Sequence, residues 1–371
     1  MILLPFYPAA RVGVLEYVAV QIRQEEMFPM SEIRPSVVRL GGSLEGSERE
    51  VGIIEAAGGT LTFVQPHGEA SAIDAIRDAD VVINAGGIRF SDAVFGHLNR
   101  CRAIIQCSVG YDRIEVPAAT ARGIMVVNLP DYCIEEVSDH AVALTLASAR
   151  RLFQMQRIVR EGKWAGGSYA DIVRSVDPIE RLSERTLGII GFGNIGKLVA
   201  KKTRGLFNRI LAADPWVKPE TAAQHGATLV SLEELLGQSD YVTLHVLLTP
   251  ETRHMINAER LALMKPTAYL VNTCRGPIVD EVALTETLRA GKLAGAGLDV
   301  FETEPIGADH PLANLDNVIV TPHLAVRSQS AMWQWRIQPI DDAARIIQGY
   351  YPRGMVNREL KQTLGLKEAT A

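Results

Sequence analysis

The feature that most constrains the fold is a glycine turn near the middle of the chain, Gly191-Phe-Gly-Asn-Ile-Gly196. The turn follows a short apolar run at 187–190, and Asp214 comes just past a second apolar run at 210–213. A strand, a glycine turn, a helix, a second strand and an acidic residue, in this order, are typical of a unit that holds a dinucleotide pyrophosphate. Because this unit begins near the middle of 371 residues, the chain is expected to form two domains, the first of which lies before the turn.

Each glycine of the turn has a separate expected task. Gly191 would allow the tight turn, Gly193 would let the backbone approach the pyrophosphate, and Gly196 would let the helix pack closely on the strand. The helix that begins near Asn194 and Ile195 would offer free N–H groups and the positive end of its dipole to the phosphates.

Asp214 lies 18 positions after Gly196, near the spacing expected for a carboxylate that accepts from both ribose hydroxyls. A carboxylate at that place would repel a 2′-phosphate, so the sequence favours NAD over NADP as cofactor. The alternative is that Asp214 simply opens a turn before Pro215.

Short β-rich runs alternate with helical runs in two series, which predicts two doubly wound parallel sheets of the α/β class. The first series has expected strands at 36–40, 60–64, 81–84, 103–107 and 124–128, with helices near 44–57, 70–77, 92–99 and 116–122. The second has six expected strands, at 187–190, 210–213, 241–245, 268–272, 296–299 and 318–321.

Three further segments complete the expected organisation. A single long helical stretch, roughly 135–160, joins the two series, and a tail helix at 328–349, broken near Pro339, would pack back on the first sheet. Residues 1–35 fit neither series, and they could be an arm over a partner subunit, a mobile lid, or the product of a wrongly chosen start.

The composition excludes several classes of protein. A net charge of −5 gives no electrostatic reason to expect nucleic acid or an anionic membrane as a partner. The four cysteines include no CxxC pair, so we expect neither a metal site nor a disulfide framework, and a reducing cytoplasm is the simplest setting. No apolar run is long enough to suggest a membrane span.

Three ionisable residues follow the later strands of the second series: Arg275, Glu304 and His323. Ligands of open parallel sheets bind beyond the carboxyl ends of the strands, so these side chains are expected to converge there. An arginine suits a carboxylate, a histidine can transfer a proton near neutral pH, and a glutamate can orient the imidazole. Each also has a simpler interpretation, as a surface charge, a loop residue or a structural histidine, but their ordered occurrence favours hydride chemistry on a 2-oxo acid.

Across roughly residues 36–360 the chain resembles the D-isomer-specific 2-hydroxyacid dehydrogenase family. The segments that carry the resemblance are the glycine turn with Asp214, 245–252, 271–276, 297–305 and 321–323. The resemblance implies a Rossmann NAD-binding domain at 136–324, inserted into a flavodoxin-like substrate domain made of 36–135 and 325–371. It also implies a homodimer that pairs through the long helix after Glu135.

The resemblance implies roles for individual residues. Arg275 would bind the substrate carboxylate, His323 would act as acid and base, and Glu304 would be the partner of His323. Asp299 would contact the nicotinamide carboxamide. The other implied contacts are His245, Thr252 and Thr273 for the cofactor, and Val109 and Gly110 for the substrate. Independently of the resemblance, Gly87 follows the expected strand at 81–84 and could form another wall of the pocket.

The predicted activity is therefore the NAD(H)-dependent interconversion of a small 2-oxo acid and its D-2-hydroxy acid, with the identity of the acid left open. The alternative is an NAD(H)-sensing regulator similar to the C-terminal binding proteins, which are transcriptional corepressors of the same family. Segment 131–136 faintly resembles that branch. Glu304 argues against formate dehydrogenase, which carries glutamine there.

Overall fold

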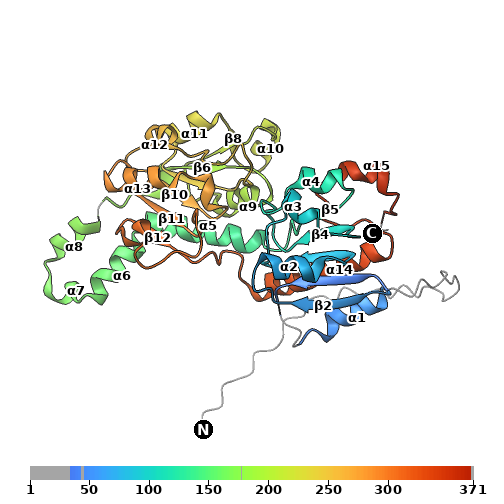
Figure 1. Cartoon of the computed structure of the whole chain (residues 1–371). Coiled ribbons are helices and arrows are strands. Elements are labelled where there is room, and N and C mark those ends of the chain that lie inside the picture. The colour runs from blue at the N-terminus through green and yellow to red at the C-terminus, as the bar shows by residue number, and fades with distance from the viewer. Residues whose placement is uncertain (1–33, 43–45, 177, 369–371) are drawn as a thin grey trace, which may run out of the picture. The chain divides into compact units, whose positions relative to one another are not determined.

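The structure is a computed structural model that describes residues 34–42, 46–176 and 178–368 (Figure 1). The interpretations of segment 1–35 therefore fall almost entirely outside the described residues. The described part of the chain forms two sheets, of five and seven strands, and every strand pair in both sheets is parallel. The prediction of two doubly wound parallel sheets is confirmed.

The first sheet has the strand order β2-β1-β3-β4-β5, which is the flavodoxin-like order. Its strands are β1 (Ser36–Leu40), β2 (Thr60–Val64), β3 (Val81–Asn84), β4 (Ala103–Gln106) and β5 (Met125–Val127). Every residue of β3, β4 and β5 is buried, because helices cover both faces of the sheet.

Alternate residues of these strands belong to two different cores. Val81 and Ile83 pack with α1 (Glu48–Ala56) and α14 (Gln329–Ile347), whereas Val82 packs on the opposite face. That opposite face is covered by α2 (Glu69–Ile76), α3 (Asp92–Phe95) and α4 (Val116–Ala121). The continuous apolar runs in the sequence thus reflect a sheet that is covered on both sides.

The tail helix α14 packs against α1, β3 and β4, as expected, but the predicted break near Pro339 is wrong. The helix runs unbroken from Gln329 to Ile347. Pro339 and its neighbours Ile337 and Ile340 are buried, so packing offsets the roughly 3 kcal/mol that an internal proline costs.

The second sheet has the order β12-β11-β10-β9-β6-β7-β8, which is the Rossmann order extended by one strand. Its strands are β6 (Thr186–Ile190), β7 (Arg209–Ala213), β8 (Thr228–Leu229), β9 (Tyr241–Leu244), β10 (Tyr269–Asn272), β11 (Gly295–Leu298) and β12 (Val318–Val320). The sequence predicted six strands, and the one it missed is β8. A strand of two residues at the sheet edge is too short to leave a periodic pattern.

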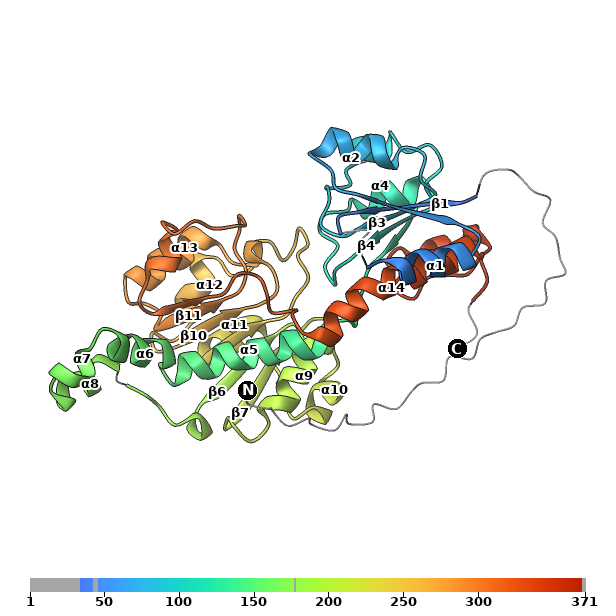
Figure 2. The same cartoon turned by 90° about the horizontal axis from the view of Figure 1, so that it is seen from below.

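Helices cover both faces of this sheet too (Figure 2). One face carries α11 (Leu232–Gln238), α12 (Ala258–Leu263) and α13 (Glu281–Arg289). The other carries α5 (Ile134–Ala149), α9 (Asn194–Thr203) and α10 (Pro219–Gln224). The remaining short helices are η1 (Leu182–Glu184), η2 (Gly276–Ile278), η3 (Pro311–Asn314), η4 (Arg358–Leu360) and α15 (Lys361–Leu364).

The single helical stretch predicted for 135–160 is wrong, because the chain turns after α5. Arg151 has a φ of +52°, and its guanidinium lies over the Tyr269 ring at 5.1 Å. A left-handed residue ends a helix, and α6 (Leu152–Arg160) begins in a new direction. It is followed by α7 (Lys163–Gly166) and α8 (Tyr169–Val176), and in both views these three helices extend beyond the second sheet (Figures 1 and 2).

No helix within the described ranges is long and apolar enough to cross a membrane. The division at residues 135 and 325 stays a prediction.

Candidate active site

The glycine turn connects β6 to α9 with the backbone geometry that glycine allows. Gly191 has a φ of +87°, and a Cβ there would lie 2.5 Å from the carbonyl oxygen of His245. A Cβ on Gly196 would clash with the carbonyl of Gly191, whereas a Cβ on Gly193 would meet nothing within 4 Å. Gly191 and Gly196 are therefore required by packing, and Gly193 leaves open space just before Asn194, the first residue of α9.

Asp214 follows β7 and holds the glycine turn. One of its carboxylate oxygens accepts from the backbone N–H of Phe192 at 2.8 Å, and the other accepts from the N–H of Trp216 at 2.9 Å. A carboxylate has about four lone-pair sites, so two remain for hydroxyl donors. The structural role and the predicted ribose contact are thus compatible in one residue.

Two buried polar atoms at the carboxyl ends of β9 and β10 have no hydrogen-bond partner among the described residues. His245 follows β9, with Nε2 3.0 Å from the Thr243 hydroxyl, and its Nδ1 is buried without a partner among the described residues. The hydroxyl of Thr273, which follows β10, is likewise buried and unpaired in the described ranges. Burial lowers the pKa of His245 to about 3, so its ring is neutral. Buried polar atoms are normally paired, and these two fit a bound cofactor that supplies hydrogen-bonding groups.

Asp299 follows β11, and its side chain is fully buried. Its carboxylate accepts from the Thr321 hydroxyl at 2.5 Å and from the backbone N–H of Leu324 and Ala325 at 3.1 and 2.9 Å. Its own carbonyl accepts from the N–H of His323 at 2.8 Å. Asp299 therefore positions the loop that carries His323.

His323 and Glu304 form a close pair. Nδ1 of the histidine is 2.6 Å from Oε2 of the glutamate, which leaves Nε2 as the other proton-bearing position. The other glutamate oxygen accepts from the N–H of Phe301 at 2.9 Å. Burial opposes ionisation of Glu304, but the hydrogen bonds from His323 and Phe301 and the charges of His323 and Arg275 hold the pKa of the carboxyl below its ordinary value. His323 has a φ of +55°, a conformation that non-glycine residues keep only where their surroundings enforce it.

Arg275 follows β10, and two hydrogen bonds hold its guanidinium. Nε donates to Oδ1 of Asp112 at 3.0 Å, and Nη1 donates to the carbonyl of Cys274 at 2.9 Å. A Cβ on Gly276 would clash with the backbone of Phe301, so the loops that carry Arg275 and Glu304 pack directly on each other. Burial raises the pKa of the Cys274 thiol to about 11, which agrees with its interpretation as a neighbour of Arg275 and not a nucleophile.

The loop after β4 reaches Arg275 from the first sheet. The Ser108 hydroxyl donates to the Gly110 carbonyl at 2.6 Å, and Asn128 donates to the Val109 carbonyl at 2.7 Å. A Cβ on Gly110 would lie 2.9 Å from Cζ of Arg275, so only glycine leaves room for the guanidinium.

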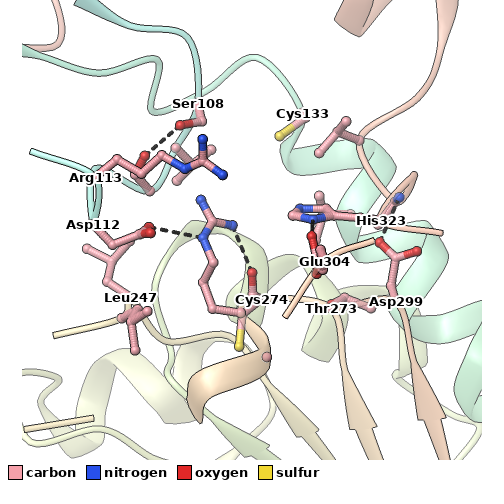
Figure 3. Close-up of a pocket in the computed structure, with 18 of the residues that line it drawn as sticks. Ser108, Asp112, Arg113, Cys133, Leu247, Thr273, Cys274, Asp299, Glu304 and His323 are labelled. Carbon is pink, nitrogen blue, oxygen red and sulfur yellow. Dashed lines mark hydrogen bonds and ion pairs between the residues drawn. The ribbon is translucent and has the colours of Figure 1, made fainter. Parts of the chain in front are cut away.

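A cavity of about 850 Å³ lies at the carboxyl ends of the strands of both sheets (Figure 3). The predicted residues that line it are Val109, Gly110, Ile195, His245, Thr273, Arg275, Asp299, Glu304 and His323. The predicted residues outside its lining are Gly87, Gly191, Gly193, Asn194, Gly196, Asp214 and Thr252.

Two of the residues outside the lining have other contacts. The N–H of Gly87 donates to Oδ1 of Asn84 at 3.0 Å, and it is the neighbouring Gly86 that lines the cavity. The Thr252 hydroxyl donates to the Leu247 carbonyl at 2.6 Å and thereby ties its own loop. Their ligand contacts stay predictions.

Among the lining residues, sequence reasoning did not assign Asp112 as the partner of Arg275, and it gave no role to Arg113 or Trp335. The indole N–H of Trp335 donates to the Cys107 carbonyl at 2.8 Å, and the guanidinium of Arg39 lies 4.9 Å from the centre of the ring. The adjacent charges of Asp112 and Arg113, which follow the expected strand at 103–107, could have indicated charged groups at the site. Nothing in the sequence around Trp335 distinguishes it from a core residue of an amphipathic helix.

Comparison with known proteins identifies the family. The family model described as "D-isomer specific 2-hydroxyacid dehydrogenase, NAD binding domain" matches residues 142–325. A glyoxylate reductase of Korarchaeum cryptofilum is 40% identical over 295 residues, which cover 80% of this chain and 88% of that protein.

Solved structures agree with this match. A D-lactate dehydrogenase of Aquifex aeolicus, complexed with NAD and lactic acid, has a TM-score of 0.73 at 29% identity, over 89% of this chain and 98% of that one. A glyoxylate reductase of Paecilomyes thermophila has a TM-score of 0.78 at 26% identity, over 88% of this chain and 99% of that one. The chain therefore belongs to the D-isomer-specific 2-hydroxyacid dehydrogenase family, and it is an NAD-dependent oxidoreductase of that family.

Proposed function

We propose that the protein reduces a small 2-oxo acid to the D-2-hydroxy acid with NADH, and catalyses the reverse reaction. The observation that carries this proposal is the convergence of Arg275, the Glu304–His323 pair and two unpaired buried polar atoms on one cavity. The site joins a carboxylate binder, a proton carrier and a place for the cofactor. Relatives named glyoxylate reductase and D-lactate dehydrogenase support the same class of substrate.

The residues divide the reaction between them. The guanidinium of Arg275, held by Asp112, forks onto the substrate carboxylate, and the amides of Val109 and Gly110 bind the same group. A nicotinamide held by His245, Thr273 and Asp299 would supply the hydride for C2 of the substrate. Nε2 of His323 gives a proton to the C2 oxygen in the same step, and the reverse reaction returns both.

Glu304 serves the reaction through His323. Its carboxylate is ionised at neutral pH, since its pKa lies below the ordinary value, and it stabilises the imidazolium form that donates the proton. The short contact also fixes the proton on Nδ1 and directs Nε2 away from the carboxylate.

The proposal that the substrate is small is supported by Trp335. Its indole is held on its edge by the Cys107 carbonyl and on its face by Arg39, so this wall of the cavity is a fixed aromatic ring. A side chain on the substrate has to fit beside that ring.

A panel of 2-oxo acids, assayed by loss of NADH absorbance, tests the proposal. We expect turnover of glyoxylate, hydroxypyruvate or pyruvate, with slower reduction of phenylpyruvate and branched acids. Failure of every member, with NADH binding intact, would refute the proposal and favour a regulatory role.

We further propose that the protein is a homodimer. Helices α6 and α7 have no buried residue, and apolar side chains on α6–α8 are exposed, with Trp164 69% and Tyr169 80% accessible. Exposed apolar surface of this kind is typical of an interface. Light scattering on the purified protein should give twice the mass of the chain, and a monomer at micromolar concentration would contradict the proposal.

A further inference from the structure

One charged side chain of the cavity has no use in the mechanism above. Among the lining residues, the acidic groups and their partners form ion pairs: Asp112 with Arg275, Glu304 with His323, and Glu302 with His254. Asp299 accepts from the Thr321 hydroxyl and two backbone amides, and its Oδ1 lies 3.5 Å from Nε2 of His140. Within the described ranges, the guanidinium of Arg113 has neither an ion pair nor a hydrogen bond, although it lines the same cavity.

The backbone of Arg113 is well fixed. Its carbonyl accepts from the N–H of Phe90 at 2.8 Å, and it directly follows Asp112, which holds Arg275. Figure 3 shows the Arg113 side chain reaching past the loop that carries Ser108 and Asp112 toward the middle of the cavity. The unpaired guanidinium thus lies beside the loop whose residues Val109 and Gly110 also line the cavity.

On the wall that Asp112, Arg113 and Arg275 share, the charges favour one additional anion. Asp112 offsets the charge of Arg275, and the Glu304–His323 pair is neutral overall when the imidazole is protonated. Arg113 is then the positive charge that is left over on this wall. A 2-oxo monocarboxylate brings one negative charge, and Arg113, which is exposed to solvent and has no protein partner within the described ranges, can give it a charge-assisted hydrogen bond.

We propose that Arg113 is a second arginine for the substrate carboxylate, so that the acid is held between Arg113 and Arg275. This inference rests on the proposed function and adds a binding residue to it. Arg275 holds the carboxylate from the second sheet and Arg113 holds it from the first. Substrate binding therefore draws on charges from both sheets.

The test compares Arg113→Gln and Arg113→Lys with wild type in steady-state reduction of the best 2-oxo acid. Arg113→Gln should lose a charge-assisted hydrogen bond that is made equally to the substrate and to the transition state. Its KM should therefore rise by about 10- to 100-fold, and its kcat should stay within about threefold of wild type. Arg113→Lys should recover part of the loss. The matched control is Arg89→Gln, since Arg89 is exposed like Arg113 but is paired with Glu115 and does not line the cavity.

A second readout does not depend on turnover. Oxamate, a carboxylate that cannot accept the hydride, is titrated into the protein–NADH complex and followed by NADH fluorescence. Weaker oxamate binding in Arg113→Gln, with unchanged NADH affinity, supports the proposal even if no tested acid is reduced, which separates it from failure of the proposed function.

Three results would overturn the inference. One is a KM and an oxamate affinity equal to those of wild type in Arg113→Gln. Another is a fall in kcat at unchanged KM, which would place Arg113 in the chemical step. The third is a KM that rises only for 2-oxo acids with a second carboxylate, because Arg113 would then bind the far end of the substrate.

Discussion

Replacing Gly110 with alanine tests whether the loop from the first sheet sets the position of Arg275. A Cβ at residue 110 would lie 2.9 Å from Cζ of Arg275 and closer still to Nη2, whereas ordinary Cβ contacts begin at 3.4 Å. The guanidinium cannot simply swing aside, because Nε is bonded to Asp112 and Nη1 to the carbonyl of Cys274. It has to retreat by about 0.5 to 1 Å, and a misplacement of about 1 Å costs on the order of 10²-fold in rate.

We therefore expect Gly110→Ala to lower kcat/KM for the best 2-oxo acid by about 100-fold, with NADH affinity and Tm close to wild type. Initial rates of NADH oxidation and a fluorescence titration of NADH give the two quantities. The matched control is Gly52→Ala in α1, where a Cβ meets nothing within 4 Å, and alanine there should stabilise the helix by about 0.5–1 kcal/mol at full activity. If Gly110→Ala keeps kcat/KM within about threefold of wild type, the guanidinium is not held as argued.

Other substitutions test the remaining parts of the site. His323→Ala should lower kcat by about 10²- to 10⁴-fold while NADH binding survives, because it removes the proton carrier, and lost NADH binding with normal turnover per bound complex would contradict that role. Glu304→Gln should cost about 1 kcal/mol of stability after allowance for solvent screening. Because the pKa of Glu304 is lowered, the stability difference between wild type and Glu304→Gln should be complete above about pH 5 and should vanish as the pH falls through the lowered pKa. Thermal unfolding of both proteins across that pH range measures it. Asp214→Ala should lower the preference for NAD over NADP and also Tm, since the glycine turn loses an acceptor; an unchanged ratio of KM values would contradict the ribose assignment. Trp335→Phe should lose about 1 kcal/mol of stability with its hydrogen bond to Cys107, measured by denaturant unfolding, and an unchanged midpoint would mean that solvent replaces the bond.

The sequence by itself determined the class of the fold and the chemistry of the site. Apolar runs of four or five residues and the helical runs between them are local patterns, so they predicted parallel strands covered on both faces. The glycine turn predicted the dinucleotide unit because its geometry is local as well, with Gly191 at positive φ and Gly196 in contact with the turn itself. Arg275 and His323 could be selected because the ends of parallel strands meet at one edge of a sheet.

The tertiary structure decided what depends on contacts between distant segments. Asp112 binds Arg275 across 163 residues of sequence, and Trp335 reaches the cavity from the tail helix. The chain turns at Arg151, whose guanidinium lies over the Tyr269 ring. Helix α14 continues through Pro339 because the helix is buried there. No local pattern encodes these contacts, because each exists only when two segments far apart in the chain pack together. For that reason the sequence predicted the cofactor site and the Arg275 side chain, whereas Asp112 as its partner and Trp335 as a wall of the cavity became visible only in the folded protein.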